Sequence, residues 1–449
     1  MSPRARRIAA SAVLALGAGL ALAFLTTPIL ALVLNLAWGQ FWTFLTSDQA
    51  LPAIGLSLFT TLVATAGCVA LGVPLAWWLA RLRRSAPYVR ALVLLPLILP
   101  PVAGGIALLT LLGRNGLVGS GMNWFGVNLP FSTLSVILAQ VFVALPFMTL
   151  ASEAAFRSIP PGQLAVAQTL GASQWRRFSS IALPLAWPGL AAGALLSWAR
   201  AFGEFGATVT FAGSLPGVTE TLPLAVYRAL ETDQDAAIAL SVVMVMLSIG
   251  IVLVLSAGWI PWGGFAKIQP VPPAPAQEPE TIRLPASPAA NHHMDLRHHL
   301  PDRLPDRPGG PPALQCNLTI NRPDFPVVVD LTLERDEILV VTGPNGAGKT
   351  TMLTAIAGLV PGHSGHIQYG EVVWCNPKSR CAVQERGIGY LPQGTEIFGH
   401  LSVVDNVAFG LRSRGSSRVA ARKTAKGVLV DLGLGALSDR YGASLSGGQ

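Results

Sequence analysis

The chain has 449 residues, of which 51% are apolar and only 12% are charged, and its formal net charge is +8. A soluble domain usually has about 25% charged residues, so the composition argues against a chain that is soluble throughout. The Arg residues lie in short clusters beside apolar segments, which is a pattern of membrane orientation and argues against a nucleic-acid partner.

Six apolar segments are long enough to cross a bilayer, which takes about 20 apolar residues. They cover roughly residues 8–35, 52–80, 89–113, 132–156, 184–210 and 236–260. The start of the first segment resembles a signal peptide, but its apolar run continues to about Ala37, so we expect a retained span. Polar or glycine-containing stretches interrupt the fifth and sixth segments. Residues 1–261 are therefore predicted to form an all-α membrane domain with six transmembrane helices, embedded in lipid.

Basic residues mark alternate loops between these segments. They precede the first span, separate the second from the third and the fourth from the fifth, and follow the sixth: Arg4, Arg6, Arg7, Arg81, Arg83, Arg84, Arg90, Arg157, Arg176, Arg177 and Lys267. The other loops are poor in Lys and Arg, and residues 214–235 are acidic. The positive-inside rule then predicts a multi-pass protein of the bacterial cytoplasmic membrane with both termini in the cytoplasm.

The loop between the fourth and fifth spans contains a spaced pattern. Gly171 is followed after nine residues by Ile181, Leu183 and Pro184, in the register Gly-x9-Ile-x-Leu-Pro. This pattern resembles the cytoplasmic loops of ABC importer permeases, whose Glu-Ala-Ala positions would here be Ala165, Val166 and Ala167. The literal Glu-Ala-Ala at 153–155 lies twelve residues too early. The resemblance implies a short coupling helix that docks on an ATPase near its Q-loop; a generic interfacial loop is the alternative.

The segment Trp198–Glu231 resembles the corresponding segment of molybdate permeases, and sulfate permeases are close relatives. Within it, Arg200 and Glu204 have i,i+4 spacing on one helix face, where the two side chains can pair. They form either a structural ion pair or part of an anion path.

Residues 262–312 are rich in proline, which predicts an extended linker that builds no core. The linker contains four histidines, His292, His293, His298 and His299, but no cysteine or carboxylate framework that would make them a metal site. The four cysteines of the chain have no metal-ligand spacing, and we expect free thiols.

The pattern then changes to strand, turn and helix, which predicts an α/β domain over 313–449. "EILVVTG" reads as a short buried strand and "GKTTMLTAIAGLV" as a helix. Between them lies a complete G-x-x-x-x-G-K-[ST] motif, the phosphate loop of P-loop proteins. Its cofactor-binding residues would be Gly343, Pro344, Asn345, Gly346, Ala347, Gly348, Lys349, Thr350 and Thr351. Lys349 should reach the β- and γ-phosphates of ATP, and the Thr350 hydroxyl should bind Mg²⁺.

"GPNGAGKTTMLTAIAGL", "GIGYLPQ" and "LSGGQ", in this order, resemble the ATPase domain of ABC transporters. The resemblance implies that Gln393 is the Q-loop glutamine beside Mg²⁺. It also implies that Phe325 stacks on adenine, with a core role as the alternative. In this family two ATPase domains pair head to tail. The signature residues Ser446, Gly447, Gly448 and Gln449 would therefore contact ATP that is bound to Lys349 of a second copy.

The family also requires a Walker B strand, which ends in Asp-Glu. "VVVDL" at 327–331 and "VLVDL" at 428–432 imitate it, but both precede the signature, so we reject both. The resemblance places the true Walker B strand, the D-loop and the switch histidine beyond residue 449. We therefore expect an incomplete P-loop ATPase domain in residues 313–449, which alone would not hydrolyse ATP.

Together, these features predict half of a type I ABC importer, with permease and ATPase on one chain. Two copies would assemble, and an extracytoplasmic molybdate-binding protein would deliver the oxyanion. Import of sulfate or thiosulfate is the alternative within the class. A membrane-anchored ATP-binding regulator without transport is the alternative from another class.

Overall fold

The computed structural model describes residues 3–82, 85–123, 129–258, 314–321, 325–334, 337–344, 346–360, 363–394 and 396–445. The linker 262–312, Asn345 and the signature residues Ser446, Gly447, Gly448 and Gln449 lie outside the described residues. Contacts divide the chain into two compact units. The first comprises Met1–Ser158 and Ala186–Pro272, and the second comprises Ile159–Leu185 and Pro273–Gln449. The loop between the fourth and fifth spans therefore groups with the ATPase region.

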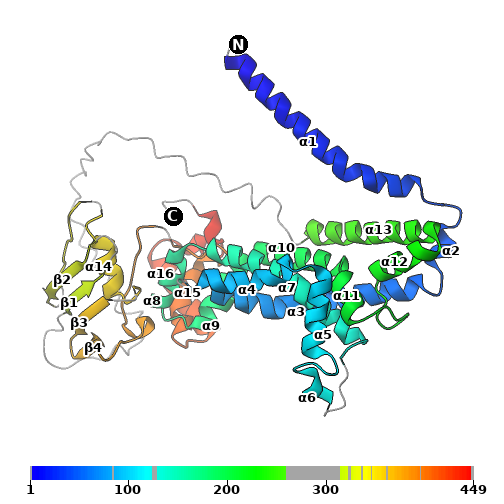
Figure 1. The fold of residues 1–449 in the computed structure, drawn as a ribbon. Helices are drawn as coiled ribbons and strands as arrows, with labels where there is room; N and C mark the ends of the chain where they lie inside the picture. The colour runs from blue at the N-terminus through cyan, green and yellow to red at the C-terminus, as the bar shows by residue number, and fades with distance from the viewer. Residues whose placement is uncertain are drawn as a thin grey trace. The chain divides into compact units, whose positions relative to one another are not determined.

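Where it is described, the first unit has helices as its only regular secondary structure (Figure 1). Its helices are α1 (Pro3–Leu34), α2 (Phe41–Leu45), α3 (Ala50–Leu79), α4 (Ala86–Ile98), α5 (Pro101–Leu112), α6 (Gly119–Asn123), α7 (Thr133–Arg157), α10 (Leu183–Phe202), α11 (Gly206–Phe211), α12 (Leu222–Thr232) and α13 (Gln234–Gly258). Among the described residues, five helical segments are long and apolar enough to cross a membrane, or six if α4 and α5 count as one bent span.

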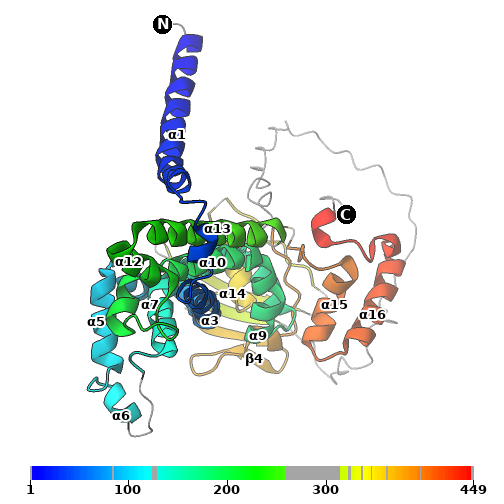
Figure 2. The same ribbon diagram turned by 90° about the vertical axis from the view of Figure 1, so that its right-hand side faces the viewer.

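The core of this unit joins helices that are distant in sequence. Helix α3 packs along α7, and α12 packs against both α3 and α13 (Figure 2). Ala50 of α3, Trp198 and Phe202 of α10, Leu222 of α12 and Leu240 of α13 share one buried cluster. The Trp198 indole N–H also donates to Thr61 Oγ1 over 3.2 Å, so the cluster contains a buried polar contact.

The third apolar segment, 89–113, is not one continuous helix as predicted. Helices α4 and α5 meet at an angle of 108°. Leu99 has an extended backbone, with ψ 136°, before Pro100 and Pro101. The ring of a proline disfavours helical geometry in the preceding residue and removes a backbone donor, so two consecutive prolines end α4 and start α5.

The fifth segment, 184–210, is also divided, because α10 ends at Phe202 and the short α11 begins at Gly206. Helix α11 lies close against α5. A Cβ atom on Gly206 would lie 2.6 Å from Pro101 Cβ, and one on Gly105 would lie 2.8 Å from the Ala207 carbonyl oxygen. The two glycines therefore permit the broken ends of two spans to pack against each other.

The second unit contains an antiparallel sheet in the order β2-β1-β3-β4. Its strands are β1 (Leu314–Ile320), β2 (Val327–Leu333), β3 (His363–Tyr369) and β4 (Val372–Cys375). Cys316, Leu318 and Ile320 alternate along β1 and pack with Ala355 of α14 (Lys349–Ile356). The other helices of the unit are α8 (Pro161–Thr169), α9 (Gln174–Arg177), α15 (Val403–Ser413) and α16 (Arg418–Asp431), with a π-helix at Phe178–Ala182.

The predicted buried strand at 337–343 is wrong for this structure. These residues form no strand, and Ile338 and Val340 are 88% and 75% exposed. A buried central strand needs hydrogen-bonding neighbours and cover on its faces. In the described part of the chain, the four strands form one sheet, and none of them pairs with this segment.

Of the two stretches that imitate Walker B, residues 327–331 form part of strand β2, whereas residues 428–431 lie in helix α16. One other expectation for this unit is confirmed. The four cysteines are free thiols.

Candidate functional site

The candidate phosphate loop surrounds the start of α14. Gly346 and Gly348 have φ angles of 88° and 97°, which glycine adopts without the strain that a Cβ atom would add. A Cβ atom on Gly348 would also lie 2.7 Å from Val327 Cγ2, so the loop packs directly against the first residue of β2. Glycine is thus required at Gly348 both by its backbone angle and by this close approach.

Lys349 is tied across this loop. Its Nζ atom donates hydrogen bonds to the carbonyl oxygens of Gly343 and Pro344, over 2.6 Å and 2.8 Å. The first backbone N–H groups of α14 have no partner within the helix and form the positive end of its dipole. An ammonium group and a helix N-terminus therefore meet at one loop, an arrangement that fits the phosphates of a nucleotide.

The two residues predicted to bind magnesium have suitable ligand atoms, and a site shared by them stays a prediction. Thr350 and Gln393 are exposed and offer a hydroxyl and an amide oxygen, the hard oxygen ligands that Mg²⁺ prefers. Among the described residues, no three His, Cys, Asp or Glu side chains form a metal-binding group. The ion would therefore depend on these oxygens together with phosphate oxygens and water.

Phe325 lies two residues before Val327, the residue that contacts Gly348. Its side chain is 41% exposed, so part of it is accessible to solvent. The position suits stacking on an adenine, which stays a prediction.

The loop between the fourth and fifth spans, residues 158–184, is called the coupling loop below. Helix α7 ends at Arg157, and Pro161 occupies the first turn of α8, where its missing N–H has no cost. Gly171, with φ 94°, ends the helix. Its N–H donates to the Gln168 carbonyl over 3.1 Å, and the N–H of Ala172 donates to that of Ala167 over 2.9 Å. These two bonds form a Schellman motif.

The coupling loop packs on the ATPase region through an apolar cluster. Ala167 and Ile181, two of the predicted positions, are fully buried with Phe398 and Phe409. Val166 is partly buried against the same cluster, and the rings of Phe398 and Phe409 lie 4.8 Å apart. The sequence pattern thus marks positions that lie in one interface within this unit.

Polar contacts surround the cluster. The Gln163 side chain donates to the Ile397 carbonyl over 3.5 Å, and His400 Nε2 lies 2.7 Å from the Ser180 carbonyl oxygen. The Arg176 guanidinium donates to the Arg412 carbonyl. These contacts follow Gln393 in the chain, so the loop meets the ATPase just after the predicted Q-loop; Gln393 itself is exposed.

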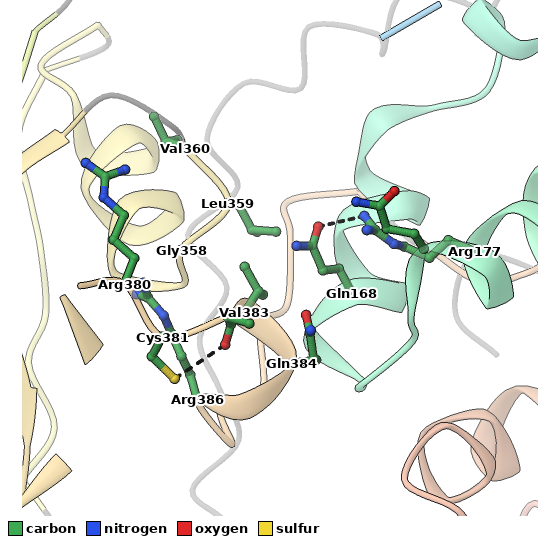
Figure 3. A pocket seen from close by; sticks show the side chains of 12 residues that line it. Gln168, Arg177, Gly358, Leu359, Val360, Arg380, Cys381, Val383, Gln384 and Arg386 are labelled. Atoms are coloured by element: carbon green, nitrogen blue, oxygen red, sulfur yellow. Dashed lines mark hydrogen bonds between the residues drawn. The ribbon is translucent and has the colours of Figure 1, made fainter. Parts of the chain in front are cut away.

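A cavity of about 440 Å³ remains on the other side of the coupling loop (Figure 3). Gln168 accepts a 2.8 Å hydrogen bond from Arg177 on one wall, and Leu359, Val383 and Arg386 line the other. Burial lowers the pKa of Arg386, whose Nη1 donates to the Ile356 carbonyl at the end of α14 over 2.5 Å. The loop is therefore in close contact with α15 and leaves space beside α14.

Arg200 and Glu204 form the ion pair that their spacing predicted. Arg200 Nη1 lies 2.6 Å from Glu204 Oε2, and Glu204 Oε1 accepts a 2.8 Å hydrogen bond from the Ala207 N–H in α11. Glu204 is 1% exposed. Because both carboxylate oxygens have partners within the protein, the geometry favours the structural alternative for Glu204.

The literal Glu-Ala-Ala at 153–155 has a structural role instead. Glu153 is 4% exposed, and its Oε1 lies 2.6 Å from Arg90 Nη2 and 3.0 Å from Arg157 Nε. The carboxylate thus joins α4 to α7. The sequence predicts Arg90 only as a signal of membrane orientation.

Sequence reasoning also missed four residues of the coupling interface. They are Arg176, Phe398, His400 and Phe409. Phe409 lies on the apolar face of α15, and that periodicity was the one signal that could have identified it.

Comparison with known proteins now decides the family. Residues 71–261 match the model of the binding-protein-dependent transport system inner membrane component, and residues 328–449 match that of the ABC transporter. A molybdenum transport system permease protein ModB of Mycobacterium tuberculosis is 45% identical over 235 residues, which cover 52% of this chain and 89% of the relative. The chain belongs to the binding-protein-dependent transport permeases. It joins that permease to an ABC transporter ATPase region.

Two further relatives of this permease family bear on its substrate. ModB of Escherichia coli K12 is 35% identical over 216 residues, which cover 48% of this chain and 94% of the relative. The sulfate transport system permease protein CysT of the same organism is 32% identical over 251 residues, covering 54% and 91%. As a permease of this family, the chain is a multi-pass protein of the inner membrane with its ATPase region on the cytoplasmic side.

Proposed function

We propose that the protein uses ATP to import molybdate, or its close analogue tungstate, across the inner membrane. The choice of molybdate as the substrate is supported by the 45% identity to a ModB permease over most of that relative's length. The identity to the sulfate permease CysT is 32%. The resemblance of the segment Trp198–Glu231 to molybdate permeases also supports this substrate.

In this proposal the phosphate loop binds ATP. Lys349 attracts the β- and γ-phosphates, and the N–H groups at the start of α14 donate to their oxygens. Bound Mg²⁺ would neutralise charge on the phosphates, held in part by Thr350 and Gln393. Phe325 would stack on the adenine. Ser446, Gly447, Gly448 and Gln449 of a second copy would close over the same nucleotide.

The coupling loop then transmits the state of the ATPase to the spans. Ala165, Val166 and Ala167 lie on α8, and Leu183 and Pro184 begin α10, so one continuous segment joins the interface to a membrane helix. A homodimer would contain two such loops and two ATP sites. The other partner would be an extracytoplasmic binding protein that delivers the oxyanion.

The test is ATP hydrolysis by the full-length protein in liposomes with its binding protein. We expect molybdate and tungstate to stimulate hydrolysis more than sulfate does, together with uptake of the same anion. Equal or stronger stimulation by sulfate would contradict molybdate as the substrate and favour sulfate import. ATP binding without uptake of any oxyanion would favour the alternative function, a membrane-anchored ATP-binding regulator that transports nothing.

A further inference from the structure

Two adjacent arginines of the coupling loop have different partners in the second unit. The Arg176 guanidinium donates to the Arg412 carbonyl in the last turn of α15, and its Cζ lies 5.8 Å from the centre of the Phe409 ring. Arg177 donates to Gln168 within the same loop and lines the cavity beside α14. Arg176 is therefore the arginine of α9 that reaches α15.

The end of α15 offers Arg176 an acceptor, although burial and the charge of the neighbouring Arg412 lower the pKa of its guanidinium. The Arg412 carbonyl already accepts a 3.3 Å hydrogen bond from the Gly415 N–H, and Arg176 adds a charged donor. Carbonyls in the last turn form the negative end of the helix dipole, and a guanidinium over an aromatic ring gains further attraction. Because a charged donor makes the stronger type of hydrogen bond, this contact is a specific attachment of the loop.

Helix α15 is in turn connected to the segment that leads into the signature. It shares a buried cluster with α16, against which Leu445 packs. The backbone N–H groups of Val403 and Val404 donate to the carbonyls of Arg440 and Ser438, and that of Gly442 donates to Leu401. A displacement of α15 would therefore carry residues 438–445 with it, and Ser446 follows directly.

We propose that Arg176 is a positioning residue that couples the signature-bearing segment to the permease. It holds α9 on the end of α15, so that a displacement of α15 together with residues 438–445 moves the coupling loop. The coupling rests on the proposed ATP-driven transport, but it does not depend on which anion is carried.

The experiment compares Arg176→Ala with Arg177→Ala in the full-length transporter in liposomes. Both variants remove one positive charge from α9, but only the first removes the contact with α15. The readouts are hydrolysis without binding protein, hydrolysis with the loaded binding protein, and anions imported per ATP hydrolysed. We expect Arg176→Ala to keep hydrolysis without binding protein within about twofold of wild type. The stimulation of its hydrolysis by the loaded binding protein and its import of anions per ATP should both fall about fivefold or more. Arg177→Ala should remain close to wild type in both readouts.

Two further variants separate a coupling role from a folding role. Arg412→Ala removes a neighbouring side chain but keeps the backbone carbonyl, so its stimulation should remain near that of wild type. Arg176→Gln keeps a neutral donor and should lose most of the stimulation even if Arg176→Ala fails to assemble. Wild-type stimulation in Arg176→Gln, or an equal loss in Arg177→Ala, would overturn the proposal. Every variant is compared with wild type using the anion that stimulates wild type best, so a change of substrate leaves this test valid.

Discussion

At the scale of single residues, chemistry follows from residue type and local geometry. Lys349 illustrates this, because its role was predicted from the motif and its ammonium lies across the loop between Gly343 and Pro344. Glu153 shows the converse. Its Glu-Ala-Ala context only imitates the loop motif, out of register by twelve residues, and its contacts with Arg90 and Arg157 make it a structural anion.

Replacing Lys349 by Ala should abolish ATP-driven transport. The substitution removes the charge that neutralises the β- and γ-phosphates, a type of contact that supports both binding and transition-state stabilisation. Uptake of the oxyanion into proteoliposomes should fall at least about a hundredfold, while the protein still inserts in the membrane. Lys378→Ala, which changes an exposed lysine beyond β4, is the control and should transport normally. Undiminished uptake by Lys349→Ala would contradict the assignment of the loop.

At the scale of elements, the residues at the two ends of the coupling helix α8 predict its bounds better than its apolar pattern does. Pro161 at its start and Gly171 at its end define α8, because proline suits the first turn and glycine suits the left-handed terminator. The bend in the third span has an equally local cause, the consecutive Pro100 and Pro101. Hydropathy alone does not predict this bend.

Gly171→Ala should weaken coupling by distorting this terminator. A side chain at φ 94° costs about 1–2 kcal/mol, and the new Cβ atom would lie 3.3 Å from Arg414 Cγ. We expect a lower thermal midpoint together with reduced stimulation of hydrolysis by the binding protein. Gly217→Ala is the matched control, since Gly217 has φ 71° and no atom within 4 Å of its added Cβ. It should lose similar stability but keep its stimulation; a similar loss of stimulation in both would argue against a specific role for Gly171.

At the scale of the whole molecule, charge distribution determines how the chain lies in the membrane. Basic residues lie in the loops predicted to be cytoplasmic, and the positive-inside rule predicts that the segment between α11 and α12 is on the opposite side of the membrane. The second unit then contains both the ATPase region and the coupling loop, as a cytoplasmic position requires.

Cysteine labelling of intact cells tests this orientation. A membrane-impermeant maleimide should label Gly217→Cys, in a loop that is predicted to face outwards, without permeabilisation. Lys378→Cys in the ATPase region should be labelled only after the membrane is opened. The wild-type protein should give little background from outside, because Cys68, Cys316 and Cys375 are buried and Cys381 lies in the ATPase region. The opposite labelling pattern would reverse the predicted topology.

The sequence by itself determined the features that depend on local chemistry. Apolar length gave the spans, proline and glycine gave the ends of α8, and the glycine-lysine spacing gave the phosphate loop, because each needs only neighbouring residues. The positions Ala167 and Ile181 also followed from spacing, although their partners Phe398 and Phe409 did not.

Tertiary structure alone decided what depends on residues far apart in the chain. It paired Glu153 with Arg90, placed Arg176 on the end of α15, and left the apolar segment 337–343 exposed without a neighbouring strand. A strand is stabilised by hydrogen bonds to another strand, and a buried charge is stabilised by its partner. Both partners lie elsewhere in the chain, so a single stretch of sequence cannot predict either stabilisation. The span lengths, by contrast, follow from sequence because a transmembrane helix satisfies its backbone hydrogen bonds within itself.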